Sequence, residues 1–401
     1  MSAPPLQSAQ SHLPQSAQGR GHTRDRARRP TPRPRTHFAL PDTLAAHAPP
    51  EARGLARDQV RLLVARSPGS IDHAEFRDLP DYLSPGDLLV VNTSGTQAAA
   101  VDGTVGPGRT PVVVHVSTPL GGEQARREWA IELRTAPDAA QPVLDAAPGD
   151  RIEVSHPGAT TESEAAVVAL TLLNGYPEPG ADGRNRLWRA QAEGALETVL
   201  TREGRPIRYG YVADRWPLAS YQTVFATEPG SAEMPSAGRP FSADLVTRLA
   251  TTGVLIAPVT LHTGVSSQES GELPLPEWFR VPAVTADVVN WTRARGGRVI
   301  AVGTTATRAL ESAVGADGVA SGAGGWTNLV IGPDRPTRAV DSLITGLHAP
   351  DASHLLLLEA VAGPRLVRMA YQAALEHGYL WHEFGDTNLL LSERKAPKAA
   401  A

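Results

Sequence analysis

The chain has 401 residues, a formal net charge of −4 and no cysteine. This length suits two domains that each bury a core. Without cysteine the chain forms no disulfide, iron–sulfur cluster or zinc–thiolate site, so we predict no metal centre and no radical cluster chemistry. No signal-peptide core and no run of about 18 apolar residues occurs, and we expect a cytoplasmic protein without a membrane partner.

Residues 1–36 contain seven arginines and one acidic residue, among many prolines, serines and glutamines. Such a segment lacks the apolar side chains needed for a core, so we predict that it is disordered, as is the tail 393–401. Two interpretations of the N-terminal segment are open, a nucleic-acid-binding arm and a solvated leader; the arginines show no helical spacing, which favours the leader. Removing its six net positive charges from the total of −4 leaves −10, so nucleic-acid binding by the body needs a local arginine patch.

Two kinds of sequence pattern alternate along the chain after the N-terminal tail. Residues 37–92 and 201–392 mix helix and strand patterns and predict one discontinuous α/β domain. Residues 93–200 instead hold short β-rich runs between turns with glycine or proline, which is typical of a small antiparallel barrel inserted into that domain. The runs are Pro111–Val116, Glu128–Arg134, Arg151–Val154, Ala165–Leu173 and Arg186–Gln191.

Arginines and aromatic residues interleave in the segment after the predicted barrel. One interpretation is an RNA-binding patch, with the rings stacked on unpaired bases. The other is a loop whose aromatic side chains pin it to the body. The residues concerned are Arg202, Arg205, Arg208, Arg215, Tyr209, Tyr211 and Trp216.

Further along, helix and strand signals alternate again. A helix over Ala243–Thr251 is predicted to end before a glycine, and a strand over Val254–Leu261 follows it. Ser353 is placed to cap a helix that contains Leu355–Leu358, and Gly363-Pro364 separates this helix from a second one that ends near Gly378.

The run from Arg298 to Ser312 carries the most information. An apolar strand stops at Gly303, and Thr304 and Thr305 are placed to cap the free N–H groups of the helix that follows. Ala306, Ala309, Leu310 and Ala313 form the apolar side of that helix. Such a helix start suits an anion or a polar ligand, whereas a plain strand-to-helix connection is the structural alternative.

An ordered series of short motifs runs along nearly all of the chain after the N-terminal tail. The motifs are Phe38-Ala39-Leu40-Pro41, Arg57-Asp58, Gly86-Asp87-Leu88-Leu89-Val90-Val91-Asn92, Tyr221-Gln222-Thr223-Val224-Phe225-Ala226, Pro235-Ser236-Ala237-Gly238, Val259-Thr260-Leu261-His262-Thr263-Gly264, Val340-Asp341-Ser342-Leu343-Ile344-Thr345-Gly346-Leu347-His348 and Phe384-Gly385-Asp386. In this order the motifs resemble the S-adenosylmethionine:tRNA ribosyltransferase-isomerases of queuosine biosynthesis, and the order is more specific than any one motif.

The resemblance implies a β-barrel inserted in an α/β domain and a transfer of the ribosyl group of S-adenosylmethionine to 7-aminomethyl-7-deazaguanine in tRNA. S-adenosylmethionine is then a co-substrate and no cofactor is needed. The sulfonium acidifies the C5′ protons, so the site needs a general base, a proton route to the departing adenine and donors for the methionine carboxylate. We expect tRNA and S-adenosylmethionine as partners, and a monomer.

Four acids and bases are candidates for the catalytic role: Asp341, His348, Asp386 and Glu277. Asp341 and His348 are seven residues apart in one motif, and the resemblance implies that a strand end and a turn bring both side chains to one pocket. The motifs and the helix start imply seven substrate-binding residues: Gly303, Thr304, Thr305, Arg308, Tyr221, Gln222 and His262. Arg308 suits a carboxylate or phosphate held by two parallel hydrogen bonds. Structural alternatives stand beside these roles, because aspartates also cap helices and turns, His348 suits a buried hydrogen-bonded histidine, and Arg308 lies where it can pair with Glu311.

Several polar positions depart from the family pattern. Where the family has His-x-Met-His-x-Glu, residues 272–277 keep only Glu277, and Asn92 is followed by Thr93-Ser94-Gly95 instead of Asp-Thr-Arg. Three hypotheses are therefore open: the tRNA-modifying enzyme itself, a divergent paralogue on the same fold with another nucleoside or acceptor, and a non-catalytic nucleotide-binding protein. The acidic body favours the second, and the retained Asp341 and His348 argue against the third.

Overall fold

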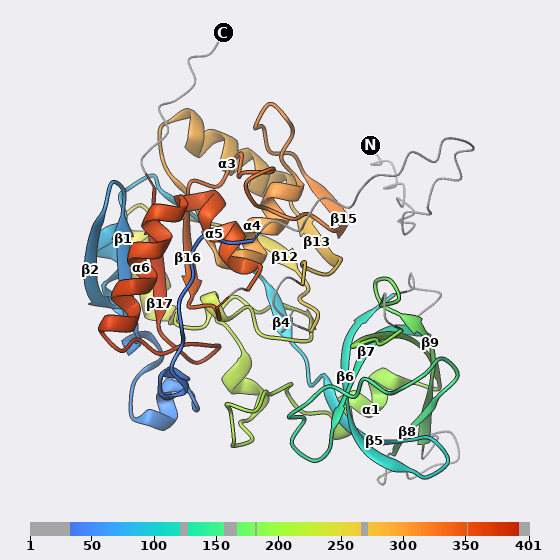
Figure 1. Ribbon diagram of the computed structural model, residues 1–401. Coiled ribbons are helices and arrows are strands. Elements are labelled where there is room, and N and C mark those ends of the chain that lie inside the picture. The colour runs from blue at the N-terminus through green and yellow to red at the C-terminus, as the bar shows by residue number, and fades with distance from the viewer. Residues whose placement is uncertain are drawn as a thin grey trace, which may run out of the picture.

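The computed structural model describes residues 33–120, 127–155, 167–180, 183–265, 272–350 and 352–392. Most of the predicted N-terminal tail and the whole C-terminal tail lie outside this range. Within it, the chain forms an α/β domain and a β-barrel that stand side by side (Figure 1). The expectation of an α/β domain with an inserted small antiparallel barrel is confirmed.

The α/β domain is built on a mixed sheet of nine strands (Figure 1). In spatial order these are β15 (Ala323–Thr327), β13 (Glu277–Val281), β12 (Leu255–Leu261), β3 (Leu88–Asn92), β14 (Val299–Val302), β16 (Ser342–Gly346), β17 (Thr387–Leu391), β1 (Arg61–Arg66) and β2 (Ser70–Glu75). The central strands β12, β3, β14 and β16 are parallel, while β13 and β17 run antiparallel to their inner neighbours β12 and β16. The carboxyl ends of the four parallel strands therefore meet the amino ends of β13 and β17 at one edge of the sheet.

Helices cover both faces of this sheet because its strands are apolar on both sides. Alternate residues of β1 illustrate this: Leu63 packs with helices α3–α6 on one face, and Leu62 packs with α2 and η4 on the other. The α-helices of the domain are α2 (Ala243–Thr251), α3 (Ala283–Ala294), α4 (Gly303–Ser312), α5 (His354–Ala362) and α6 (Pro364–Glu376). The 3-10 helices are η1 (Asp42–Leu44), η2 (Pro50–Arg53), η3 (Arg57–Gln59), η4 (Phe76–Tyr82), η5 (Leu218–Tyr221) and η6 (Ser236–Gly238).

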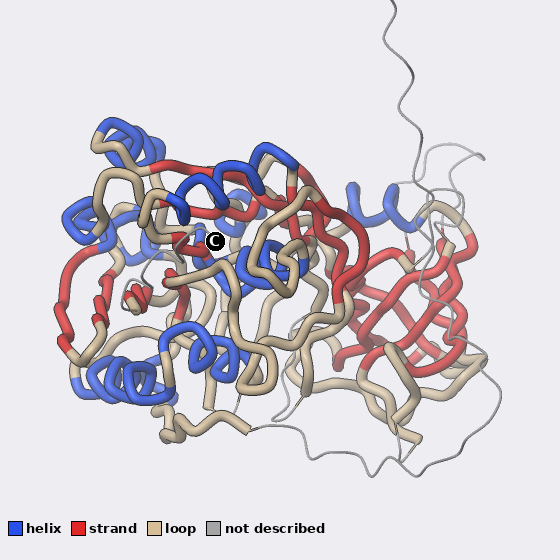
Figure 2. The backbone as a smooth tube through the Cα atoms, turned by 90° about the horizontal axis from the view of Figure 1, so that it is seen from above, coloured by secondary structure: helices blue, strands red, loops and turns tan. Residues whose placement is uncertain are grey.

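Six antiparallel strands close into the barrel, which Figure 2 shows from above as a separate group of strands. They are β5 (Ala100–Val105), β6 (Thr110–Pro119), β7 (Glu128–Thr135), β8 (Arg151–Ser155), β9 (Val167–Gly175) and β10 (Leu187–Glu193), and α1 (Leu196–Glu203) follows the last strand. The interior is filled by alternate apolar residues such as Val112, Val114 and Ile131. The parallel pair β4 (Ser94–Thr96) and β11 (Glu228–Ser231) lies where the chain enters and leaves the barrel.

Most predicted elements are found close to their expected limits. The helix Ala243–Thr251 has the predicted bounds, and the five β-rich runs correspond to β6 to β10. The sequence did not predict β5, whose polar Asp102 and Gly103 break the apolar pattern. Gly103 is needed there because a Cβ would lie 3.0 Å from the carbonyl oxygen of Glu153 on the neighbouring strand.

Two predicted helix caps are wrong. Helix α4 starts at Gly303 itself, after Val302, and no side chain caps it. Thr304 and Thr305 therefore lie inside its first turn, where the Thr305 hydroxyl accepts a hydrogen bond from Asn92. Ser353 does occupy the N-cap position of α5, but its hydroxyl caps no backbone N–H. In both cases the tertiary neighbours, and not local capping, fix the helix start.

Within the described residues, no helix has the length and apolar character of a membrane span.

The helices of the α/β domain are held by packing and by buried carboxylates. Glu311 of α4 is 1% exposed and accepts the backbone N–H groups of Arg338, Ala339 and Val340 at 2.8–3.0 Å, besides an ion pair with Arg335. This single side chain therefore anchors the segment that leads into β16. The predicted pairing of Arg308 with Glu311 is wrong, because Glu311 is occupied here.

We expect Glu311→Ala to lower the free energy of unfolding by about 3 kcal/mol or more, because it leaves buried N–H groups and Arg335 without their acceptor. Glu376→Ala is the matched control, since Glu376 is exposed on α6 and contacts only Gln372 among the hydrogen-bond partners seen. Urea unfolding of both variants checks the prediction. Equal midpoints in the two variants would contradict the anchoring role of Glu311.

Candidate functional site

A cavity of about 440 Å³ lies at the edge of the sheet where the parallel strands end. Its wall is made of residues that follow β12, β14 and β16, residues that precede β13 and β17, and the segment that returns from the barrel. Crevices outside the carboxyl ends of parallel strands are the usual ligand sites of α/β sheets. The volume lies in the range of small-molecule sites. We therefore take this cavity as the candidate active site.

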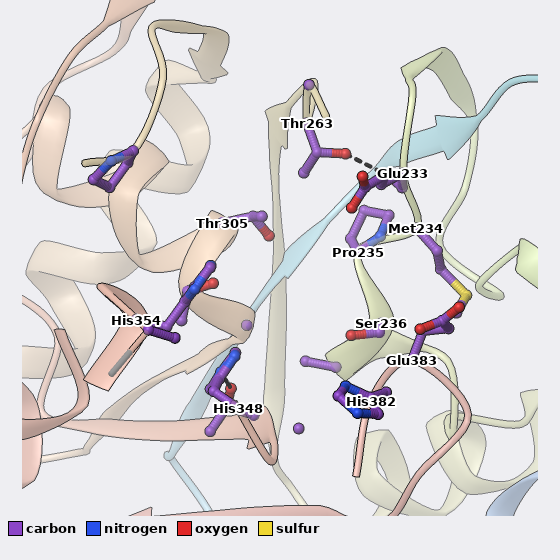
Figure 3. Close-up of a pocket in the computed structure, with 18 of the residues that line it drawn as sticks. Glu233, Met234, Pro235, Ser236, Thr263, Thr305, His348, His354, His382 and Glu383 are labelled. Atoms are coloured by element: carbon purple, nitrogen blue, oxygen red, sulfur yellow. Dashed lines mark hydrogen bonds between the residues drawn. The ribbon is translucent and has the colours of Figure 1, made fainter. Parts of the chain in front are cut away.

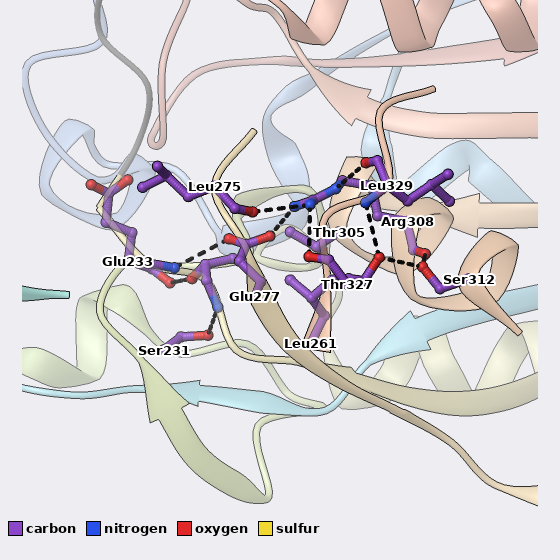
Figure 4. Close-up of polar contacts among 12 residues, drawn as sticks. Ser231, Glu233, Leu261, Leu275, Glu277, Thr305, Arg308, Ser312, Thr327 and Leu329 are labelled. Carbon is purple, nitrogen blue, oxygen red and sulfur yellow. Dashed lines mark hydrogen bonds and ion pairs between the residues drawn. The ribbon is translucent and has the colours of Figure 1, made fainter. Parts of the chain in front are cut away.

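One wall is braced by an ion pair between Glu277, at the start of β13, and Arg308 of α4 (Figure 4). Arg308 also donates to the backbone carbonyls of Leu275 and Leu329 at 3.1 Å, and Glu277 accepts the N–H of Gly264 at 3.2 Å. Burial raises the pKa of Glu277, against the attraction of Arg308. The guanidinium is thus engaged with protein acceptors. The carboxylate that it binds in this structure is that of Glu277, whereas a ligand carboxylate was expected.

The start of α4 forms another part of the wall. Gly303, Thr304 and Thr305 all line the cavity, and Gly303 has φ +96°, a conformation that favours glycine. A Cβ at this position would also lie 3.3 Å from the Cβ of Ala237. The first N–H groups of a helix have no partner within the helix, so this turn offers donors to a ligand.

Two histidines from neighbouring elements stack face to face on one side of the cavity (Figure 3). The rings of His348 and His354 are 4.6 Å apart and nearly parallel. The His348 ring shares a 2.9 Å hydrogen bond with the Thr345 hydroxyl, and its backbone N–H donates to the Tyr371 hydroxyl. Burial lowers the pKa of His354 to about 4 and the pKa of His348 well below its ordinary value. Both rings are therefore neutral at pH 7.

The opposite wall carries two carboxylates, each held by a tyrosine of the segment Tyr209-Gly210-Tyr211. The Tyr209 hydroxyl donates to Glu233, and the Tyr211 hydroxyl donates to Glu383 at 2.5 Å. Figure 3 shows Glu383 beside Met234 and near His382, across the cavity from His348. The His382 ring stacks on Tyr211 at 4.0 Å, and burial lowers the pKa of His382 to about 4.

The charges of the cavity wall are mainly negative. Its ionisable side chains comprise three carboxylates, one arginine and three histidines. Arg308 balances Glu277, the histidines are neutral, and the tyrosines that hold the other two carboxylates carry no charge. The sequence analysis expected the start of α4 to favour an anion, but the cavity as a whole favours a cation. A ligand that is cationic at one end and carries a carboxylate at the other satisfies both features.

The structure brings seven of the predicted site residues together in the cavity wall: Glu277, His348, Gly303, Thr304, Thr305, Arg308 and Tyr221. Tyr221 is 3% exposed and packs 5.1 Å from the Phe384 ring. The remaining four predicted residues, Asp341, Asp386, Gln222 and His262, are not part of this wall.

Asp341 and Asp386 have structural contacts instead. Asp341 precedes β16 and accepts the N–H of Val299, whereas His348 follows the same strand. Five strand residues place the two roughly 16 Å apart at opposite edges of the sheet, so the expectation of one shared pocket is wrong. Asp386 is 5% exposed and accepts from the Arg61 backbone and guanidinium and from the Leu380 N–H, which ties the loop before β17 to β1.

Gln222 and His262 also serve the framework. The Gln222 amide accepts from the Thr96 N–H and donates to the Thr96 carbonyl, so it extends the edge of β4. The His262 ring lies 2.7 Å from the Ser94 hydroxyl and stacks on Trp278, packed against Gly230, where a Cβ would come within 2.4 Å of it. Their predicted substrate-binding role is not supported by this placement.

Sequence reasoning missed the residues that give the cavity its charge and its flat faces: Tyr209, Tyr211, Glu233, His354, His382 and Glu383. These residues lie in loops or at a helix start, and no periodicity marks them. A signal was present, because Glu233 stands close to the motif that starts at Pro235, and Glu383 directly precedes Phe384-Gly385-Asp386.

The arginine and aromatic segment after the barrel matches the second interpretation, a loop pinned to the body. Tyr209 is 7% exposed in an apolar cluster with barrel residues. Arg205 pairs with Asp102, and Arg208 donates to the backbone carbonyls of Val212 and Ala213. Stacking of these tyrosines on RNA bases is therefore excluded in this conformation.

No group of three or more histidines, aspartates or glutamates suited to a metal ion occurs in the described part of the chain. The predicted acids and bases that line the cavity take part in hydrogen bonds and ion pairs.

Comparison with known proteins identifies close relatives. A family described as "Queuosine biosynthesis protein" matches residues 35–390. An S-adenosylmethionine:tRNA ribosyltransferase-isomerase of Methylorubrum extorquens is 36% identical, with 89% of this chain and 96% of the relative covered. One of Symbiobacterium thermophilum is 34% identical, with 88% and 98% covered. A crystal structure of an S-adenosylmethionine tRNA ribosyltransferase from Thermotoga maritima covers 89% of this chain and 99% of its own, at 25% identity and a TM-score of 0.47.

We expect Arg308→Met to lower the free energy of unfolding by about 3–5 kcal/mol, because it leaves the Glu277 carboxylate buried without its partner. The double variant Arg308→Met with Glu277→Leu removes that charge as well and should recover part of the loss. The recovery stays incomplete because three backbone carbonyls still lack the arginine. Urea unfolding of the single and double variants gives the coupling, and a strictly additive result would contradict the ion pair.

The neutral histidines predict a pH dependence of stability. The unfolded chain protonates its histidines near pH 6.5, whereas the pKa of His354 and of His382 in the folded protein is about 4. Between these values the unfolded state binds more protons, so stability falls as pH drops from about 6.5 towards 4. His354→Gln and His382→Asn should each flatten the dependence of the melting temperature on pH between 7 and 5. His377→Gln, an exposed control, should keep the slope of the parent protein.

Proposed function

The chain belongs to the queuosine biosynthesis protein family, and we propose that its reaction takes place in the cavity at the carboxyl edge of the nine-stranded sheet. The protein is an S-adenosylmethionine:tRNA ribosyltransferase-isomerase. It moves the ribosyl group of S-adenosylmethionine to 7-aminomethyl-7-deazaguanine in tRNA, releases adenine and methionine, and gives epoxyqueuosine. Its substrates are therefore S-adenosylmethionine and tRNA.

The observation that carries the proposed site is the charge of the cavity. S-adenosylmethionine has a sulfonium and an ammonium cation, and the aminomethyl group of the acceptor base is an amine that protonates in water. Glu233 and Glu383 accept hydrogen bonds from neutral tyrosine hydroxyls, which support the charged form of a carboxylate without cancelling its charge. A partly buried carboxylate attracts a cation far more strongly than one in bulk water. The wall is thus complementary to both substrates.

The methionine carboxylate of the donor needs hydrogen-bond donors, and the start of α4 supplies them. We assign this carboxylate to the first turn, Gly303 to Thr305, where backbone N–H groups and two hydroxyls face the cavity. The positive end of the helix dipole stabilises an anion at this position. The positive φ of Gly303 makes the turn possible directly after β14.

The adenine of the donor needs a flat, neutral surface with hydrogen-bonding edges. We assign this role to the stacked rings of His348 and His354, which remain neutral because burial lowers the pKa of each. A neutral imidazole both donates and accepts a hydrogen bond. His348 is held by Thr345 and by Tyr371, so its orientation is fixed before a ligand binds.

The departures from the family pattern have a structural explanation at Glu277. This is the one residue of the His-x-Met-His-x-Glu stretch that the chain retains, and it forms the ion pair with Arg308. Keeping the glutamate keeps the wall between β13 and α4 in place. The altered neighbours change the rim of the cavity and leave the ion pair between Glu277 and Arg308 intact.

The monomeric state and the cytoplasmic location of the protein stay predictions.

The proposed site is tested with S-adenosylmethionine and tRNA that bears the 7-aminomethyl-7-deazaguanine precursor. We expect S-adenosylmethionine to raise the melting temperature, and adenine to appear only when the precursor tRNA is present. His348→Gln should lower kcat/KM by about tenfold or more, because it removes a ring from the adenine face. Asp341→Asn should leave turnover of the folded protein within about twofold, at a cost in stability of about 1 kcal/mol.

Comparison of these two variants distinguishes a residue that belongs to the site from a residue that only supports the fold. A folded His348→Gln protein with unchanged kcat/KM would remove His348 from the site. Adenine release from S-adenosylmethionine with an unmodified tRNA, or with no RNA, would favour a paralogue with a different acceptor.

A further inference from the structure

The reaction needs a group that removes a C5′ proton of the donor, and few cavity residues can do so. Burial raises the pKa of Tyr209, Tyr211 and Tyr221, so all three phenols stay protonated near neutral pH. Burial lowers the pKa of His354 and of His382 to about 4 and the pKa of His348 well below its ordinary value, which leaves each a weak base. The His348 ring is also engaged with the Thr345 hydroxyl. The candidates left are the carboxylates.

Glu277 is a poor candidate because both of its oxygens are engaged. One forms the ion pair with Arg308, and the other accepts the N–H of Gly264. A proton added to this carboxylate would leave the Arg308 charge buried without its partner, which is costly. Two carboxylates remain, Glu233 and Glu383.

These two carboxylates have the same support but different positions. Glu233 belongs to the segment that returns from the barrel, and the tyrosine that holds it packs against barrel residues. Glu383 belongs to the loop that leads into β17, in the α/β domain, near His382 and across from His348 (Figure 3). Glu383 thus lies across the cavity from the histidine surface assigned to the donor, whereas Glu233 is tied through Tyr209 to the barrel.

We propose that Glu383 is the general base that removes the C5′ proton of S-adenosylmethionine, with Tyr211 as its positioning residue. This inference rests on the proposed function of the cavity. The Tyr211 hydroxyl donates a hydrogen bond to Oε2 of Glu383 in the cavity wall. The Tyr211 ring is itself fixed by the stacked His382 ring, so the carboxylate is held in one orientation.

The proton moves from C5′ to Glu383 and then to adenine. The C5′–H bond breaks, its electron pair stays on C5′ beside the positive sulfur, and the proton forms an O–H bond with Glu383. This pair then forms a C4′=C5′ double bond as the C4′–O4′ bond breaks, and the O4′ pair forms a carbonyl with C1′ as the bond between C1′ and adenine breaks, so that the last electron pair leaves with adenine. The protonated Glu383 then gives its proton to the adenine, which restores the carboxylate. One residue thus serves as base and as acid, without an added reagent.

The pKa of Glu383 suits this role. Burial raises it, and the hydrogen bond from Tyr211 partly offsets the rise. The titratable groups near Glu383 include Tyr211 and Tyr221 from the segment after the barrel, His382 beside it and His348 across the cavity. Arg239 and Asp386 line a smaller cavity together with Glu383. A carboxylate with a raised pKa takes up a proton more readily than an ordinary one.

The main experiment measures single-turnover adenine release with S-adenosylmethionine and precursor tRNA. Glu383→Gln should lower the rate by about 100-fold or more, with less than about a tenfold change in the Kd of S-adenosylmethionine. Glu376→Gln, the same change at an exposed position, should behave as the parent protein. Glu383→Ala should regain rate when formate is added, since a small carboxylate fits the space that is left.

The pH profile gives a readout that a purely structural role would not move. The parent rate should fall on the acidic side, because a protonated Glu383 cannot accept a proton. Tyr211→Phe removes a donor to the carboxylate, raises the pKa of Glu383 and should move this acid limb to higher pH. Glu376→Gln, at an exposed position of α6, should leave the limb in place.

The outcomes separate this inference from the proposed function. If the parent protein neither binds S-adenosylmethionine nor releases adenine, the proposed function fails and the inference fails with it. If the parent is active while Glu383→Gln keeps the rate and the acid limb, only the inference is overturned. Loss of the acid limb in Glu233→Gln, with the limb retained in Glu383→Gln, overturns it as well and assigns the base to Glu233.

Discussion

The ion pair between Glu277 and Arg308 joins the parts of the molecule that enclose the active site. Glu277 begins an antiparallel strand on the outer side of the sheet, and Arg308 belongs to the helix that starts in the middle of the cavity wall. Neither element forms a cavity alone. Because the pair is desolvated and its remaining polar atoms bind backbone groups, it fixes the distance between strand and helix. The position of Gly303 at the floor of the cavity follows from that distance.

The ion pair fixes the elements around the cavity, and neutral side chains then hold the charged side chains of its wall. Tyrosine hydroxyls hold Glu233 and Glu383 without cancelling their charge, whereas an arginine in the same place would have neutralised them. Buried histidines add flat surfaces that carry no charge at neutral pH. This choice of partners explains how the cavity stays attractive to the cationic groups of its substrates inside a wall that excludes much of the water.

The barrel contributes to the site although none of its strands lines the cavity. Tyr209 lies in an apolar cluster with barrel residues such as Val113 and Leu187, and its hydroxyl reaches Glu233 in the cavity wall. The distance from the barrel surface to the reaction site is thus spanned by one side chain.

The sequence by itself determined the family, the two-domain fold and the strand that ends before Gly303, because apolar periodicity, glycine and motif order are local signals. It misplaced Asp341 beside His348, since seven residues of separation do not reveal that a whole strand lies between them. Glu383, Glu233 and His354 came together only in the tertiary structure. Their positions depend on loops whose course is set by contacts between distant segments, and such contacts leave no period in the sequence.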